Sequence, residues 1–364
     1  MTDAIIIGTR PEIIKCAPLI KLYERRRTDL VLIHTNQHYS FNMDKLFFEE
    51  MQLREPDHNL NVGSGTHAEQ TGKIMVGVEK FLEKSKIDTI LVQGDTNTVL
   101  GSSLAASKLR VKIGHVEAGL RSFDKSMPEE VNRVLTDHIS DFLFCPTERS
   151  RQNALAEGIP DQKIHVVGNT IVEATLQHYD IARKQTARIM QKIGVVANKF
   201  NLLTAHRPAN VDDPARLKQL VGIMHAIVSQ TGFPIVFPIH PRTRSKLDAY
   251  GLLEKLPREV QLIDPVGYLD FLVFEKNAKL IFTDSGGVQE EACILRKPCI
   301  TLRENTERPE TVDVGANIIT NFDIQKIKAA ISEFSTRKLD YQIPLGDGTT
   351  SEKIFEILMR EKKR

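Results

Sequence analysis

The stretch IFTDSGGVQEEACIL, residues 281–295, indicates how this chain folds. The apolar run AKLIF at 278–282 is typical of a buried parallel strand. Ser285, Gly286 and Gly287 then form a turn, after which apolar residues recur at helical spacing. A strand, a Ser-Gly-Gly turn and a helix start present N–H groups to an anion, which predicts a phosphate or pyrophosphate site. An ordinary strand-to-helix turn that needs glycine for tight packing explains the same residues equally well.

Short apolar runs alternate with helical stretches along most of the chain. The runs predict strands at 4–8, 29–35, 88–94, 112–118, 141–146, 164–169, 199–205, 233–239, 260–263, 278–282, 298–302 and 316–320. Helices are expected at 13–25, 41–51, 68–84, 98–109, 129–140, 213–231 and 351–363. Further helices are expected to start near Arg242, Tyr268 and Gly287, and residues 54–66 are expected to form a loop. Strands that alternate with helices imply right-handed βαβ units and parallel sheets covered on both faces.

The chain is too long for one ordinary hydrophobic core, since it has 364 residues. The same plan of elements runs through both halves, which are joined by a helical connector at 169–198. We therefore expect an α/β protein with an N-terminal Rossmann-like domain at 1–169 and a C-terminal one at 170–349.

Composition excludes several classes of function. The net charge of +2 gives no support for binding to nucleic acid or to a membrane surface, and no apolar run approaches the ~20 residues that span a bilayer. Cys16, Cys145, Cys293 and Cys299 have no C-x-x-C spacing, so neither zinc nor a disulfide framework is expected. The first strand begins almost at Met1, which leaves no room for a signal peptide. These features predict a cytoplasmic protein.

Polar loops follow corresponding strands in the two halves. GTRPE (8–12) and TAHRPAN (204–210) each follow the first strand of a half, and QGDTNT (93–98) and TDSGG (283–287) each follow a later one. In open α/β sheets, ligands bind beyond the carboxyl ends of the strands. If the two sheets face each other, all four loops are expected to line one cleft.

Charged side chains in the first half are candidates for chemistry. Arg10 lies at a helix entrance, where it would meet a phosphate, a carboxylate or a sugar, or form a surface salt bridge. Asp95 follows a strand, either as a catalytic carboxylate or as a helix N-cap. Glu117 also follows a strand, and Arg121 is its expected partner because a lone buried charge is costly. Glu129 begins a helix, where acidic residues also favour the helix dipole.

The second half carries candidates of a different kind. His206 follows a strand and is a candidate general acid or hydrogen-bond donor to a phosphate. His240 is a second candidate for these roles. Arg303 and Arg308 are expected to reach a diphosphate held at the Ser-Gly-Gly turn. Glu291, on the helix after that turn, is expected to accept bonds from ribose hydroxyls.

Eight motifs occur in order over residues 8–310: GTRPEIIK, QGDTNT, HVEAGLRS, MPEEVNR, TAHRPAN, IHPRTR, TDSGGVQEEA and LRENTERPE. Together they resemble the non-hydrolysing UDP-N-acetylglucosamine 2-epimerase family, and the resemblance covers almost the whole chain. It implies a GT-B-like fold with UDP between two Rossmann-like domains, and a homodimer. It also implies that residues 350–364 return to the N-terminal domain.

The resemblance implies an elimination mechanism. A base removes the C2 proton of the sugar as UDP leaves C1, and the 2-acetamidoglucal then regains a proton on the other face of C2 while UDP adds back. This reversible conversion of UDP-N-acetylglucosamine to UDP-N-acetylmannosamine needs no cofactor and no metal. By matching motifs, the family's catalytic residues correspond to Asp95, Glu117, Glu129 and His206. Contacts to UDP or substrate correspond to Arg10, Lys15, Arg133, His206, Phe271, Ser285, Gly286, Gly287, Glu291 and Arg308.

Four other functions use parts of the same set. An epimerase of a related UDP-2-acetamido sugar would have identical motifs, and a hydrolysing relative would differ only in whether water reaches the glucal. A GT-B glycosyltransferase needs at most one base, so the three carboxylates argue against it. A nucleotide-sugar sensor would have no need of the carboxylates.

Overall fold

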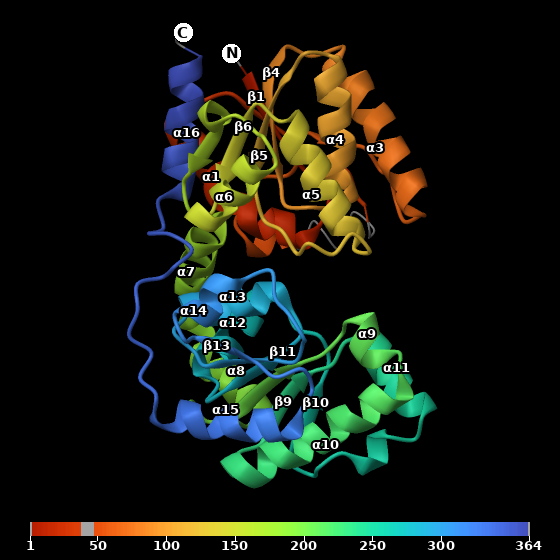
Figure 1. The fold of residues 1–364 in the computed structure, drawn as a ribbon, viewed down its shortest axis with the longest axis vertical. Coiled ribbons are helices and arrows are strands. Elements are labelled where there is room, and N and C mark those ends of the chain that lie inside the picture. The colour runs from red at the N-terminus through yellow and green to blue at the C-terminus, as the bar shows by residue number, and fades with distance from the viewer. Residues whose placement is uncertain (1, 38–46, 363–364) are drawn as a thin grey trace. The chain divides into compact units, whose positions relative to one another are not determined.

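The computed structural model describes residues 2–37 and 47–362, and it has two compact units (Figure 1). Unit 1 comprises Met1–Ala174 and Leu345–Arg364, and unit 2 comprises Thr175–Pro344. Helix α7 (Thr170–Ala182) carries the chain from one unit into the other.

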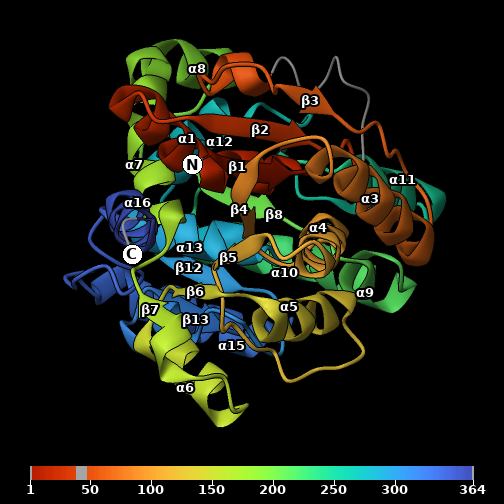
Figure 2. The same cartoon turned by 90° about the horizontal axis from the view of Figure 1, so that it is seen from above.

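Unit 1 is built on a seven-stranded parallel sheet with the order β3-β2-β1-β4-β5-β6-β7, which Figure 2 shows in succession from β2 to β6. Its strands are β1 (Thr2–Ile7), β2 (Leu30–His34), β3 (His58–Asn59), β4 (Ile87–Gln93), β5 (Lys112–Val116), β6 (Phe142–Cys145) and β7 (Ile164–Val166). Its helices are α1 (Arg10–Arg26), α3 (His67–Leu82), α4 (Asn97–Lys108), α5 (Pro128–Ile139), α6 (Glu148–Ala156) and α16 (Thr350–Glu361). The C-terminal helix α16 packs on α1, where the rings of Phe355 and Tyr23 meet edge to face at 5.0 Å.

Unit 2 repeats the plan with six parallel strands in the order β10-β9-β8-β11-β12-β13. The strands are β8 (Asn201–Thr204), β9 (Ile235–Pro238), β10 (Val260–Ile263), β11 (Ile281–Thr283), β12 (Cys299–Thr301) and β13 (Asn317–Ile319). The helices are α8 (Thr186–Ile193), α9 (Pro208–Val211), α10 (Pro214–Thr231), α11 (Pro241–Ala249), α12 (Tyr268–Asn277), α13 (Gly286–Ile294), α14 (Pro309–Asp313) and α15 (Ile324–Thr336).

The strands of unit 2 show why the sheet needs helices on both faces. Leu202 packs into one hydrophobic cluster and Leu203 into another, and Val236 and Phe237 divide in the same way. Because successive side chains of a strand point to opposite faces, a continuous apolar run requires cover on both sides.

The shared strand order decides where a site can form. In each sheet the first strand of the unit lies beside both the second and the fourth, so the order reverses between β1 and β4 and between β8 and β11. Such a switch point leaves a crevice at the carboxyl ends of the strands, where Rossmann-like folds bind ligands. The four polar loops selected from the sequence follow these four strands.

The structure adds elements that the sequence analysis did not predict. Residues 54–66, expected to form a loop, contain the edge strand β3, and the helices α6, α9, α14 and α15 were not predicted. Helix α6 buries only Ser150 and Ala154, so it has almost no apolar periodicity, whereas the buried residues of α15 do recur at helical spacing. Of the helix expected at 41–51, residues 47–50 are helical and 41–46 lie outside the described residues.

Gly8, directly after β1, is required by the packing beneath the first loop. A Cβ atom at this position would lie 2.1 Å from Thr98 Oγ1 and 2.2 Å from Thr35 Oγ1, two hydroxyls that already bond to each other at 2.8 Å. The loop that carries Arg10 can therefore approach α4 only if residue 8 lacks a side chain.

We expect Gly8→Ala to destabilise unit 1 by about 1–3 kcal/mol, because the added methyl group overpacks the site. Gly72→Ala is the matched control: within the described part of the chain its Cβ meets no atom within 4 Å, and it lies inside α3. There alanine is expected to be neutral or to raise stability by up to about 1 kcal/mol. Thermal unfolding measures both, and equal midpoints for the two variants would contradict the packing argument.

Candidate active site

Glu117, in the loop after β5, is a buried carboxylate with partners from two other elements. Its Oε2 lies 2.6 Å from Lys15 Nζ, which comes from α1, and 2.6 Å from Gln93 Nε2 at the end of β4. Only 4% of its side chain is exposed. The lysine and the amide together supply the charge and the hydrogen bonds that a buried carboxylate requires.

The backbone at Glu117 is strained. Its φ is 70°, in the left-handed region that side chains other than glycine rarely adopt. The amides of Glu117 and Ala118 both donate to the carbonyl oxygen of Phe144, at 3.1 and 3.2 Å, and hold this conformation. Strain of about 1–3 kcal/mol that the surroundings enforce is typical of functional sites.

Arg121 is not the partner of Glu117, contrary to the prediction. Its guanidinium lies 2.7 Å from Asp137 and also bonds to both oxygens of Glu157. The left-handed conformations of Glu117 and Gly119 turn the chain between the two residues, so the four-residue spacing of a helix does not apply here.

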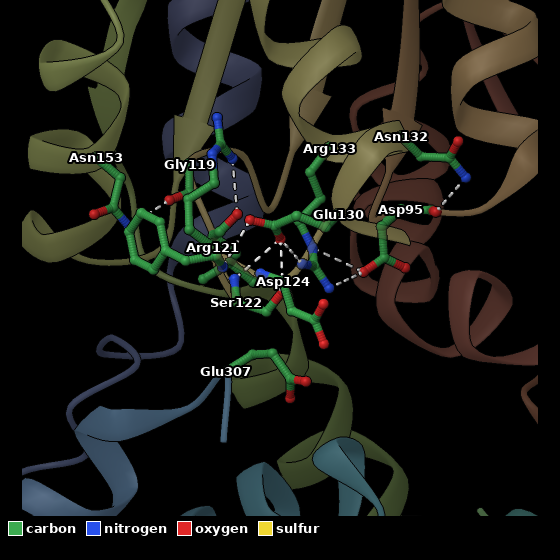
Figure 3. Close-up of polar contacts among 12 residues, drawn as sticks. Asp95, Gly119, Arg121, Ser122, Asp124, Glu130, Asn132, Arg133, Asn153 and Glu307 are labelled. Atoms are coloured by element: carbon green, nitrogen blue, oxygen red, sulfur yellow. Dashed lines mark hydrogen bonds and ion pairs between the residues drawn. The ribbon is translucent and has the colours of Figure 1, made fainter. Parts of the chain in front are cut away.

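Asp95, in the loop after β4, is held by Arg133 of α5 (Figure 3). Arg133 donates to Asp95 Oδ2 from Nε at 3.1 Å and from Nη2 at 2.8 Å, and pairs through Nη1 with Glu130. Asn132 donates to the backbone carbonyl of Asp95 at 2.9 Å. The side chain of Asp95 is 30% exposed, so a ligand can reach a carboxylate that is already oriented.

The two adjacent glutamates at the start of α5 have different environments. Glu130 is buried and accepts bonds from the amides of Ser122 and Phe123 at 3.0 and 2.9 Å, so it organises the preceding loop (Figure 3). Glu129, the residue selected from the sequence, is exposed on the first turn. Its exposure leaves its carboxylate accessible to a ligand.

Glu12 is a site residue that the sequence analysis missed. Its Oε2 accepts from the amides of Gly8 and Thr9, at 2.5 and 2.9 Å, and Thr96 donates to Oε1 at 2.5 Å. It thereby joins the loop of Arg10 to the loop of Asp95. Burial raises the pKa of Glu12 to about 7, although the bonds from Thr96, Gly8 and Thr9 lower it. The T-x-x-E pattern of a capping box was the signal for this residue.

Arg10 is the first residue of α1, beside the same loops. Its guanidinium lies 5.6 Å from the centre of the Phe47 ring, a cation–π contact that steadies its position.

Unit 2 has a pocket of about 270 Å³ at its own switch point. The lining combines flat apolar side chains with polar groups: Thr204, Ala205, His206, Pro238, His240, Pro265, Val266, Phe271, Ser285 and Val288. Four residues selected from the sequence, His206, His240, Phe271 and Ser285, therefore lie around one cavity. An apolar wall with a few polar groups is typical of a site for a small ligand.

Asp284 orients His206 at the edge of this pocket. Its carboxylate accepts from the amides of His206 and Arg207 at 3.0 Å each, and lies 3.0 Å from His206 Nδ1. Burial would raise the pKa of Asp284, but the bond and charge of His206 and the bond from Asn210 hold it below its usual value. Because Asp284 contacts Nδ1 of His206, a ligand would bind to Nε2 of the same ring.

The N-terminus of α13 presents backbone amides at the same pocket. The first bond of the helix runs from Gln289 N to Ser285 O at 3.3 Å, so the amides of Gly286, Gly287 and Val288 precede it. A Cβ atom at Gly286 or Gly287 would come no closer than 3.9 Å to Glu307 or Ser285 respectively. The fold itself therefore tolerates a side chain at both glycines.

The two arginines after β12 have different partners. Arg303, predicted to reach a diphosphate, is bound through both terminal nitrogens to Glu307, at 2.9 and 2.6 Å. A buried carboxylate four residues away thus holds the guanidinium. Arg308 lies 2.5 Å from Glu290 of α13.

Glu291 is a buried residue of α13. Burial, followed by the charge of Glu291, raises the pKa of its neighbour Glu275 well above the ordinary value. These surroundings favour the protonated form of Glu275.

Within residues 2–37 and 47–362, no group of histidine, cysteine, aspartate or glutamate side chains has the arrangement of a metal site. Over the same residues, every helix is too short or too polar to cross a bilayer.

Comparison with known proteins gives a consistent result. A family model described as UDP-N-acetylglucosamine 2-epimerase matches residues 20–359. The chain is 55% identical over 361 residues to the UDP-N-acetylglucosamine 2-epimerase of Methanocaldococcus jannaschii, covering 98% of this chain and 99% of the relative. It is 41% identical over 361 residues to the UDP-2,3-diacetamido-2,3-dideoxy-D-glucuronate 2-epimerase of Pseudomonas aeruginosa, covering 98% of both.

Solved structures agree at the level of the fold. The crystal structure of the Methanocaldococcus jannaschii UDP-GlcNAc 2-epimerase, in complex with UDP-GlcNAc and UDP, has a TM-score of 0.90 at 54% sequence identity. The match covers 99% of this chain and 100% of that one. The fold is therefore α/β and GT-B-like, with parallel sheets of seven and six strands, as expected from the sequence.

The raised pKa of Glu12 predicts a pH-dependent stability. Between about 4.5 and 7 the unfolded chain loses the glutamate proton while the folded chain keeps it, so stability falls as the pH rises. The full loss is about 3 kcal/mol. Glu12→Gln removes this titration while its amide still accepts from Gly8 and donates to Thr96. We expect its unfolding midpoint, relative to the parent protein, to rise from pH 5 to pH 8; a constant difference would contradict the assignment.

Proposed function

This chain belongs to the UDP-N-acetylglucosamine 2-epimerase family, and we propose that it interconverts UDP-N-acetylglucosamine and UDP-N-acetylmannosamine by elimination and re-addition of UDP. A base takes the proton from C2 while the C1–O bond breaks, and the electron pair of that bond leaves with UDP. The 2-acetamidoglucal then takes a proton at the other face of C2, and UDP oxygen re-forms the bond at C1.

Unit 1 supplies the proton-handling groups in this proposal. The observation that supports it most directly is the pair of carboxylates, Asp95 and Glu117, that follow the adjacent strands β4 and β5. Each is held by a cation, Arg133 or Lys15. Two faces of C2 require two such groups, and the exposed Glu129 is a third candidate. Arg10 would bind an anionic part of the substrate.

Unit 2 supplies the UDP subsite. Phe271 and the prolines of the pocket suit a flat uracil ring, and Glu291 would accept bonds from the ribose. The amides of Gly286 and Gly287, with Ser285, His206 and Arg308, would bind the diphosphate and stabilise the negative charge that develops on UDP as it leaves. The reaction as proposed uses no cofactor and no metal.

A related substrate is the main alternative, because a relative at 41% identity is named for a UDP-2,3-diacetamido sugar acid. Hydrolysis of the glucal and glycosyl transfer are the others. We further propose that the protein is a cytoplasmic homodimer without nucleic-acid or membrane partners. The four buried free cysteines suit a reducing compartment.

Epimerisation in D2O tests the function. Proton NMR of UDP-N-acetylglucosamine with the protein, without added metal or nicotinamide, should show deuterium at C2 together with UDP-N-acetylmannosamine. Asp95→Asn, Glu117→Gln and Glu129→Gln should each lower turnover at least about 100-fold while UDP still binds, because each removes a proton-transfer group. Free N-acetylmannosamine would indicate hydrolysis instead, and full activity in all three variants would refute the mechanism.

The glycine turn gives a separate test of the UDP subsite. In Gly286→Ala and Gly287→Ala the added Cβ atom makes only ordinary van der Waals contacts in the protein. The unfolding midpoints of both variants should therefore equal or exceed that of the parent. Their methyl groups would stand where a diphosphate approaches the amides, so UDP should bind about tenfold more weakly, or about 1.4 kcal/mol. Calorimetric titration measures this, and unchanged affinity in both variants would remove the turn from the site.

A further inference from the structure

His115 lies in β5, two residues before Glu117, and its side chain is fully buried. It takes no part in the chemistry proposed above. Its ring lies between the two loops that carry Asp95 and Glu117, which makes its hydrogen bonds relevant to both.

Both ring nitrogens of His115 face acceptors. Nε2 lies 2.8 Å from the backbone oxygen of Gly94, and Nδ1 lies 2.6 Å from Asp137 Oδ1. A carbonyl oxygen can only accept, so Nε2 carries a proton. Nδ1 and the carboxyl group of Asp137 form a second hydrogen bond.

The other contacts of Asp137 favour its charged form. Its Oδ2 accepts from the amide of Gly119 at 3.0 Å and faces a terminal nitrogen of Arg121 at 2.7 Å. Burial would raise the pKa of Asp137, but the charges and bonds of His115 and Arg121 hold it below its usual value. The nearby thiol of Cys145 has its pKa raised by burial and stays neutral.

Arg121 connects the cluster to a second carboxylate. It bonds on its far side to Glu157 through Nε and Nη2, at 2.8 and 2.7 Å. Asp137 therefore lies between His115 and Arg121, and its buried carboxylate is paired and hydrogen-bonded.

The cluster also holds two backbone turns in place. Gly94, which precedes Asp95, has a φ of 85°, and its carbonyl is fixed by the imidazole. Gly119, two residues after Glu117, has a φ of 77°, and its amide is fixed by Asp137. The imidazole of His115 and the carboxylate of Asp137 therefore anchor the backbone next to Asp95 and next to Glu117.

We propose that His115 is a positioning residue whose Nε2 carries a proton, and that its bonds to Gly94 and Asp137 hold Asp95 and Glu117 in their working geometry. Its effect on turnover rests on the epimerase function proposed above. Its protonation state does not, and is tested separately.

Nitrogen-15 NMR of the parent protein labelled at histidine tests the ring protons. We expect the signals of His115, identified by their loss in a His115→Gln spectrum, to show a protonated Nε2, because the carbonyl oxygen of Gly94 can only accept. An unprotonated Nε2 would overturn the proposal.

Two matched variants test the positioning role. In His115→Asn the amide nitrogen replaces Nδ1 and keeps the bond to Asp137; in His115→Gln it replaces Nε2 and keeps the bond to Gly94. Each variant loses one of the two ring bonds, so both should unfold at similar temperatures. We expect both variants to have a kcat about tenfold lower than the parent, with the same dissociation constant for UDP, because misplaced reacting groups slow the chemical step.

A kcat at the parent level in both variants would overturn the positioning role. A parent protein without epimerase activity in the same assay would count against the proposed function alone, and the ring-proton measurement would then decide the state of His115.

Discussion

The buried charge of Glu117 is the constraint on which the arrangement of unit 1 depends. Taking a carboxylate out of water costs several kcal/mol, and only close partners offset that penalty. Here they are Lys15 and Gln93, each at 2.6 Å, so one carboxylate joins helix α1, strand β4 and the loop after β5. An ion pair of this kind contributes little net stability, but losing one partner would leave an uncompensated charge worth about 3–5 kcal/mol. The pair therefore specifies geometry more than it adds stability.

Asp95 and Glu117 differ in environment although they follow neighbouring strands. The Asp95 side chain is 30% exposed and is held by an arginine, whereas that of Glu117 is 4% exposed and is held by a lysine and an amide. Different surroundings are how a protein gives two carboxyl groups different tendencies to hold a proton. An epimerase that works on both faces of one carbon needs this kind of asymmetry. Glu12 and the His115 cluster stabilise the loops from which these two residues project.

Unit 2 uses the same strand order for a different chemical purpose. Its switch point has a helix N-terminus, a histidine oriented by Asp284 and an apolar wall, and its backbone amides point to the pocket. This combination suits a phosphorylated ligand with a flat ring, whereas the ion pairs of unit 1 suit proton transfer. One fold plan thus supports two tasks because the loops after the strands differ, while the strands are alike.

The sequence by itself determined the fold class, the alternation of strands and helices, and the loops that carry chemistry, because apolar periodicity and glycine turns are local signals. Ordered motifs also identified the family. Only the tertiary structure decided the partners: Glu117 pairs with Lys15 rather than Arg121, Arg303 with Glu307, and Glu130 rather than Glu129 with Arg133. It also showed that Glu12 and His115 lie beneath the site. Hydrogen bonds and ion pairs depend on positions within about 3 Å, and Lys15 and Glu117, which are 102 residues apart in the chain, reach those positions only when the sheet is assembled.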